Sequence, residues 1–121
     1  MTTAKNLGIW MDHSSAHLIE FTNNLLATQT VDTKFAHKVR HDNLTDHKEQ
    51  QQRSGYYKQL CVIIKDYERV VLFGNTEAKT ELYNILRADH RFAKITINVV
   101  QTDNLNDNQQ HAFVRSHFLM P

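Results

Sequence analysis

Carboxylates are the first residues to consider, because hydrolysis with two divalent metal ions needs several of them around one site. Asp12 directly follows an alternating run of apolar residues that is typical of a β-strand. Glu49 lies near the start of an expected helix, and the next expected strand, 70–73, is followed by glycine and asparagine rather than by an acid. Asp12 alone does not make such a site, so metal-dependent hydrolysis is the alternative interpretation and not the first one.

Histidine is frequent, with eight residues in the chain, and two pairs are spaced by four: His13 with His17 and His37 with His41. This spacing brings two imidazoles onto one face of a helix, but neither pair falls in an expected helix. On a strand the two rings would stand about 13 Å apart, too far to share one ion. The single cysteine, Cys61, falls in an expected apolar helix stripe. We therefore predict no metal site, no cofactor and no disulfide bond.

The junction between strand 70–73 and the next helix is a candidate anion site. Gly74, Asn75 and Thr76 stand where backbone N–H groups at a helix start can bind an anion, and Lys79 follows one turn later. The residues match neither of the glycine-rich phosphate-binding motifs. A tight turn with a helix cap explains them as well, and it is favoured over the weak anion site.

The segment 33–54 combines five Lys and Arg residues with three histidines and few apolar residues. Basic side chains contact phosphates, and neighbouring aromatic side chains stack on unpaired bases. Three acidic residues interleave with the basic ones, so a solvated loop explains the segment equally well. The predicted RNA-binding residues are Lys34, Lys38, Arg40, Lys48 and Arg53.

The elements that must position these residues follow from apolar spacing and turn signals. The expected elements are strands over 7–11, 16–21 and 25–31, a helix capped by Thr45 or Asp46, a strand over 70–73, a helix capped by Asn75 or Thr76, a strand over 94–100 and a final helix capped by Asn104 or Asn106. The second helix is expected to bury Ala78, Leu82, Ile85 and Leu86. The order β-β-β-α-β-α-β-α predicts an α/β fold with a ribonuclease H-like, mixed five-stranded sheet and helices packed on it.

Composition narrows the class of protein. The 121 residues are 40% hydrophobic and 22% charged, with a formal net charge of +1, which predicts one globular domain over 1–121. No apolar run reaches the roughly 20 residues of a membrane span, and the first residues lack the apolar core of a signal peptide. We therefore expect a cytoplasmic protein with no membrane partner, and the near-neutral charge gives no reason to predict DNA binding.

Three parts of the chain resemble a known family. They are Val70–Leu82, then Val99–Leu105 with Asn108, Gln109 and Phe118, and then Gly8–His13 with Ala16 and His17. They resemble the small bacterial proteins labelled translational machinery proteins, which are single-domain relatives of the middle domain of archaeal and eukaryotic class I release factors and of Pelota. The resemblance covers nearly the whole chain. It implies a ribonuclease H-like fold and a role on or near ribosomes.

The sequence departs from release factors at the residues that carry their chemistry. Release factors have a Gly-Gly-Gln tripeptide before the first long helix, whereas residues 49–55 read Glu-Gln-Gln-Gln-Arg-Ser-Gly. Without the two glycines the backbone lacks the freedom that the tripeptide requires. The expected function is a non-catalytic, translation-associated domain that contacts ribosomal or transfer RNA. The alternatives are a magnesium-dependent hydrolase acting on RNA or peptidyl-tRNA through Asp12, and a protein–protein adaptor or homo-oligomer that pairs through the apolar residues 118–120.

Overall fold

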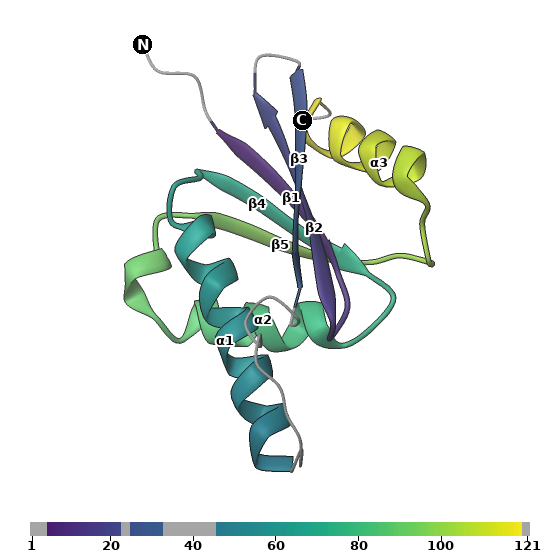
Figure 1. Ribbon diagram of the computed structural model, residues 1–121. Helices are drawn as coiled ribbons and strands as arrows, with labels where there is room; N and C mark the ends of the chain where they lie inside the picture. Colours follow the sequence, from purple (N-terminus) through teal and green to yellow (C-terminus); the bar gives the residue numbers. More distant parts are fainter. Residues whose placement is uncertain (1–4, 23–24, 33–45, 120–121) are drawn as a thin grey trace.

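The computed structural model describes the backbone of residues 5–22, 25–32 and 46–119, and their side chains except those of residues 25, 32 and 46–54. Figure 1 shows the arrangement of the elements. They are β1 (Asn6–Met11), β2 (Ser15–Thr22), β3 (Leu25–Asp32), α1 (Asp46–Ile64), β4 (Arg69–Gly74), α2 (Ala78–Arg87), the short 3₁₀ helix η2 (His90–Phe92), β5 (Thr96–Gln101) and α3 (Asp107–Leu119). The expected order of strands and α-helices is confirmed, and η2 is an addition to it.

The five strands form one mixed sheet in the order β3-β2-β1-β4-β5. The pairs β1–β2 and β2–β3 are antiparallel, as short turns between consecutive strands require. The pairs β1–β4 and β4–β5 are parallel and are joined through α1 and α2. This is the predicted ribonuclease H-like α/β fold.

Helices cover both faces of the sheet, which explains why all six residues of β1 are buried. Alternate residues such as Leu7 and Ile9 pack with Tyr56 and Leu60 of α1 and Leu82 of α2 in one core cluster. The residues between them face α3 in a second cluster, built from Trp10, Ile19, Phe21, Val71, Phe73 and Val114. In Figure 1, α3 lies across the sheet from α1 and α2.

Gly8 decides how closely α3 approaches the sheet. A Cβ atom added at Gly8 would overlap the side chain of Val114, which is fully buried in α3. The absence of a side chain at Gly8 therefore lets the helix backbone come close to β1, and any larger residue would push α3 away from the second cluster.

The helix starts test the cap predictions. At α3 the Asn106 backbone N–H donates to Gln109 Oε1 at 2.9 Å and the Gln109 N–H donates to Asn106 Oδ1 at 2.8 Å, so Asn106 is the cap. At α2 the cap position is Glu77, which makes no side-chain cap bond, and not Asn75 or Thr76. Thr76 acts from one residue earlier, accepting the Ala78 N–H on Oγ1 at 3.2 Å.

The buried stripe of α2 is narrower than predicted. Ala78, Leu82 and Leu86, each four residues apart, are fully buried, but Ile85 is 44% exposed. A spacing of four keeps these three residues in one row facing the sheet, and Ile85 falls at the edge of that row. Among the described helices, none is long and apolar enough to span a membrane.

Candidate functional site

The parallel strands β1 and β4 end side by side at Met11 and Gly74. Ligands of open α/β sheets bind beyond the carboxyl ends of parallel strands, where the connecting loops diverge. Gly74 has φ +145° and a Cβ atom there would lie 2.7 Å from the Met11 carbonyl oxygen. A glycine is thus required for the two strands to end together. Three turns meet here: β1–β2, β4–α2 and the turn after β5, where the Thr102 N–H donates to the Gly74 carbonyl at 2.9 Å.

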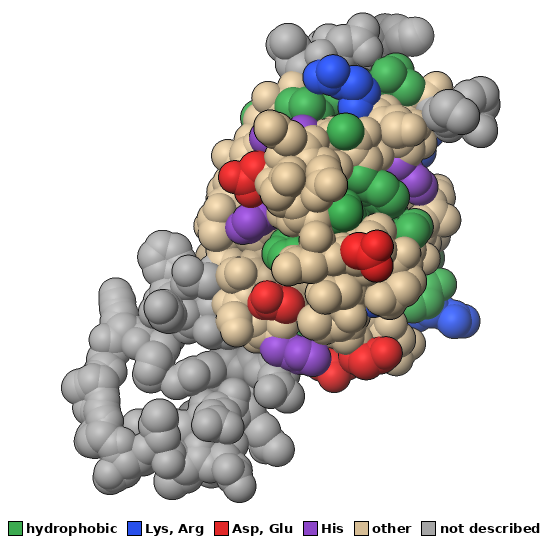
Figure 2. All heavy atoms as spheres, turned by 90° about the vertical axis from the view of Figure 1, so that its right-hand side faces the viewer, with side chains coloured by type: hydrophobic (Ala, Val, Ile, Leu, Met, Phe, Trp, Pro, Cys, Tyr) green, Lys and Arg blue, Asp and Glu red, His purple; other side chains and the backbone are tan. Residues whose placement is uncertain are grey.

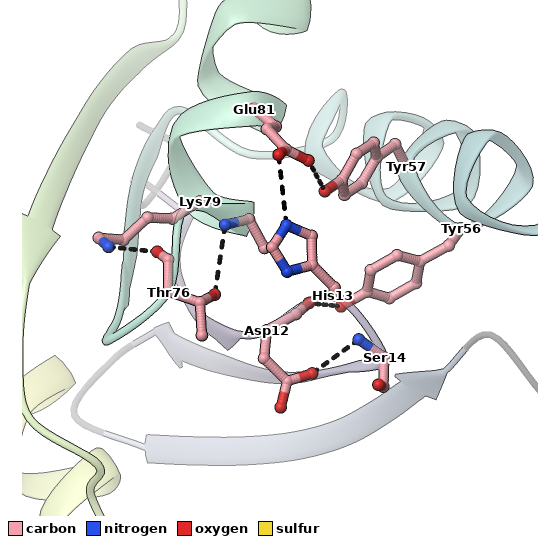
Figure 3. Close-up of polar contacts among 9 residues, drawn as sticks. Asp12, His13, Ser14, Tyr56, Tyr57, Thr76, Lys79 and Glu81 are labelled. Carbon is pink, nitrogen blue, oxygen red and sulfur yellow. Dashed lines mark hydrogen bonds and ion pairs between the residues drawn. The ribbon is translucent and has the colours of Figure 1, made fainter. Parts of the chain in front are cut away.

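Asp12 lies at the end of β1, as predicted, and its carboxylate holds the β1–β2 turn. Its Oδ1 accepts hydrogen bonds from the backbone N–H of Ser14 at 2.7 Å and of Ser15 at 2.9 Å. The Asp12 carbonyl oxygen accepts the hydroxyl of Tyr56 at 2.9 Å, which ties the turn to α1 (Figure 3). The carboxylate therefore has a structural role in the turn, whatever else it contacts.

Glu81, in the first turn of α2, connects two further elements to this place. Its Oε1 accepts the hydroxyl of Tyr57 at 2.6 Å, and its Oε2 lies 3.3 Å from Nε2 of His13 (Figure 3). The side chains of His13 and Glu81 are 37% and 43% exposed. A carboxylate, an imidazole and the hydroxyl of the buried Tyr57 thus meet from three elements beside the ends of β1 and β4.

The junction proposed as an anion site is folded inward. Lys79 is only 2% exposed, and its ammonium donates to the Thr76 carbonyl at 2.5 Å and to Gln101 Oε1 at 2.7 Å. It therefore ties the β4–α2 turn to the end of β5. Asn75 is exposed and Thr76 is half-buried. An anion at this junction stays a prediction from the sequence, and the Lys79 ammonium is already held by protein acceptors.

The structure describes only two of the five predicted RNA-binding residues, and only their backbone. Lys34, Lys38 and Arg40 lie outside the described residues. Lys48 and Arg53 lie in the first part of α1, where only the backbone is described. Figure 1 shows that this part of α1 projects beyond the sheet. Residues 50–52, the glutamines of the departure from release factors, are inside this helix and not in a loop.

The histidines of the 13/17 pair have different partners. His13 lies against Glu81 on the side of α2, whereas His17 Nδ1 lies 2.8 Å from Gln110 Oε1 of α3 and its ring lies 5.5 Å from that of Trp10. Within the described part of the chain, no group of three or more His, Cys, Asp or Glu side chains is placed to hold a metal ion. Cys61 is half-buried, and burial raises the pKa of its thiol, so the thiol is protonated at neutral pH.

Sequence reasoning missed the joint position of His13, Tyr57 and Glu81. Nothing in the sequence sets these residues apart, because Tyr57 stands beside a second tyrosine, Tyr56, and Glu81 lies one helical turn after Glu77. The available signal was topological, since both helices begin or pass near the carboxyl ends of β1 and β4. Their contact depends on side-chain geometry that spacing alone does not give.

Comparison with known proteins assigns the chain to no family, since no family model and no curated protein matches it. Solved structures do match. Pelota of Thermoplasma acidophilum aligns with a TM-score of 0.60 and 13% identity over 93% of this chain. Pelota of Archaeoglobus fulgidus aligns with a TM-score of 0.63 and 7% identity over 96%.

A third match is Saccharomyces cerevisiae Dom34, described as a translation termination-like factor involved in RNA quality control and interacting with Hbs1, with a TM-score of 0.50 and 10% identity over 96% of this chain. The chain spans about a third of the length of these proteins, 32% in each case. The likeness confirms the expected Pelota-like fold, and identities this low show the fold alone.

Proposed function

We propose that the chain is a cytoplasmic, translation-associated binding domain that contacts ribosomal or transfer RNA without catalysing a reaction. The observation that supports this proposal is the match of almost the entire chain to one domain-sized third of Pelota and Dom34. A fold can carry unrelated functions, so the proposal also needs a surface suited to RNA.

That surface is the segment with Lys34, Lys38, Arg40, Lys48 and Arg53. It connects β3 to α1, and the start of α1 projects away from the sheet (Figure 1). Phosphate contacts from five basic residues make the affinity steeply dependent on salt.

The test is cosedimentation of the purified chain with ribosomes through a sucrose gradient. Five phosphate contacts predict an affinity roughly 10²- to 10³-fold lower at about 200 mM salt than at about 50 mM. Charge reversal of the five residues to Glu is expected to abolish cosedimentation. The matched control reverses five exposed basic residues elsewhere, Lys5, Lys58, Lys65, Arg87 and Lys94, and is expected to keep most of it. A chain that stays at the top of the gradient at about 50 mM salt would refute the proposal.

Magnesium-dependent hydrolysis is the second candidate, and the position of Asp12 at the end of β1 favours it. The substitution Asp12→Asn is a clean test, because an amide oxygen can still accept the N–H groups of Ser14 and Ser15. Magnesium-dependent cleavage of RNA or peptidyl-tRNA that is lost in Asp12→Asn, in a chain that still folds, would favour the hydrolase. Equal background turnover in both chains would favour the binding domain.

A further inference from the structure

A groove separates the C-terminal half of α3 from the starts of β4 and β5. It has a volume of about 570 Å³, within the roughly 300–1,000 Å³ range of small-molecule sites. It opens on the face of the sheet opposite α1 and α2, and at the other end of the parallel strands from Asp12. Figure 2 shows that hydrophobic side chains gather on the side of the molecule that carries α3.

One wall of the groove is a row of rings from α3. Phe113 stacks on the buried Phe73 with ring centroids 4.3 Å apart. His117 continues the row, 5.9 Å from Phe113 at an interplanar angle of 18°, and Phe118 meets His117 edge-on at 4.9 Å. Phe113, His117 and Phe118 are half-buried, so each ring keeps part of its surface accessible in the groove.

The other wall comes from β4 and β5 and is polar. The exposed side chains of Thr96 and Asn98 line it, because α3 covers the neighbouring strands and leaves this corner of the sheet open. Ser116 of α3 faces the groove between the walls. Among the described residues, none makes a hydrogen bond to the side chains of Thr96, Asn98 or Ser116, so their donors and acceptors are available to a ligand.

The charge of the groove is positive. Arg69 lies at its end with Cζ 5.5 Å from the centroid of the Phe118 ring, and its Nε donates to Asn6 Oδ1 at 2.9 Å. That bond fixes the side chain, and the two terminal nitrogens donate a hydrogen bond to no described residue. Burial, and after it the Arg69 guanidinium, lowers the pKa of His117, so its imidazole is a neutral ring at pH 7. None of the seven residues that line the groove is acidic.

The aromatic wall, the polar wall and the guanidinium of Arg69 together favour one class of ligand. Aromatic surface stacks on bases of any kind, amide and hydroxyl groups contact base edges, and a fixed guanidinium suits a phosphate. An apolar peptide would leave Arg69 and Asn98 desolvated without partners, at a cost in affinity. A duplex holds its bases inside the stack, where these rings do not reach them.

We propose that the groove between α3 and the start of β5 binds an unpaired nucleotide of single-stranded RNA, with the base on the rings of α3 and the phosphate at Arg69. The proposal shares the RNA ligand with the proposed function and otherwise stands apart from it, since the groove contains none of residues 34–53. It assigns to this domain a second RNA contact at the far end of the sheet.

The test titrates the isotopically labelled full chain with a short single-stranded oligoribonucleotide and follows backbone amide shifts by NMR. We expect shifts at Thr96, Asn98, Ser116 and His117. We expect Phe118→Leu, which keeps the apolar packing and removes the ring, to bind roughly 5- to 100-fold more weakly. Ser116→Glu, an exposed change that cannot empty the core, should weaken binding similarly by placing a negative charge in the groove.

Arg69→Gln and Arg115→Gln form the matched pair. Both remove one positive charge, but Arg115 is exposed on α3 and does not line the groove. Arg69→Gln is expected to lower the affinity at least about fivefold and the salt slope by about one, and Arg115→Gln to change both far less. Equal loss in the two variants, tight binding by Phe118→Leu, equal binding of a duplex of the same sequence, or shifts absent from the groove would each overturn the proposal.

The experiments can refute each of the two proposed RNA sites independently of the other. Charge reversal at residues 34–53 should leave the oligonucleotide shifts in the groove intact, whereas Ser116→Glu should leave most ribosome cosedimentation intact. Groove binding that persists when cosedimentation is absent in the unmodified chain would refute the proposed function and support the groove. Recovery of a peptide ligand in the groove, with no effect of RNA, would refute the nucleotide site.

Discussion

The carboxyl ends of β1 and β4 and the groove beside α3 use their polar groups in opposite ways. At the strand ends, Asp12 accepts the N–H of Ser15 at the start of β2, Glu81 accepts the Tyr57 hydroxyl of α1, and Lys79 donates to Gln101 of β5. In the groove, Asn98 and the terminal nitrogens of Arg69 have no such bond among the described residues, although both regions combine charged and aromatic side chains.

This difference separates groups that hold the fold together from groups that remain for a ligand. A buried donor that loses its acceptor is still removed from water but no longer forms a hydrogen bond, which destabilises the folded state. Substitutions at the strand ends should therefore mainly lower stability. An exposed amide without a hydrogen bond to any described residue, such as that of Asn98, contributes little to stability, so its removal should mainly lower binding. Stability and binding measured on the same variants therefore decide whether the comparison holds.

Gly74→Ala is expected to have the largest effect. The positive φ at Gly74 disfavours any side chain, and the new Cβ would meet the Met11 carbonyl oxygen at 2.7 Å. We expect the free energy of unfolding to fall by about 2–4 kcal/mol. Urea denaturation followed by circular dichroism measures it. Asn75→Ala, at the exposed neighbouring position, is the control and should stay within about 0.5 kcal/mol of the unmodified chain.

Gln101→Ala and Asn98→Ala compare the two regions on a single strand. Gln101 accepts from the buried Lys79 ammonium, so its loss should cost about 1–3 kcal/mol of unfolding free energy. Asn98 has the same side-chain chemistry but no hydrogen bond to another described residue, so its loss should change stability by less than about 0.5 kcal/mol and weaken oligonucleotide binding instead. Equal loss of stability in the two variants would contradict the distinction between the regions.

The sequence predicted the elements better than the sites, for a physical reason. Alternation in β1, the apolar run of β4 and a cap at Asn104 or Asn106 are local patterns, and the structure has the two strands and the cap at Asn106. The prediction that Ile85 is buried was wrong. Helical spacing shows which residues share a face, but the residues at the edge of that face are buried only where the sheet extends over them.

The sites depend on contacts between distant residues. The bond from Tyr57 to Glu81 spans 24 positions and the bond from Lys79 to Gln101 spans 22. The groove joins the start of β4 to the end of α3, and no motif in the sequence marks it. A basic residue such as Lys79 could be predicted near the strand ends, but whether it faces solvent or the core depends on the acceptor that β5 supplies.

His117→Phe is expected to have the smallest effect and to sharpen the description of the groove. The pKa of His117 is lowered by burial and by Arg69, so below the ordinary imidazole pKa of about 6.5 the unfolded chain binds more protons than the folded one. The contribution of the neutral imidazole to the free energy of unfolding is complete above pH 6.5 and is lost as the pH falls from there towards the pKa of His117 in the folded chain.

The substitution His117→Phe keeps an aromatic ring between Phe113 and Phe118 but removes the titrating group. The unfolding free energy of His117→Phe relative to the unmodified chain should therefore rise between about pH 7.5 and pH 5.5, as measured by urea denaturation at both values. If the difference in unfolding free energy between the two chains is the same at both pH values, the folded and unfolded chains bind the same number of protons at His117. The imidazole would then be solvated in the folded chain and not packed in the wall of the groove.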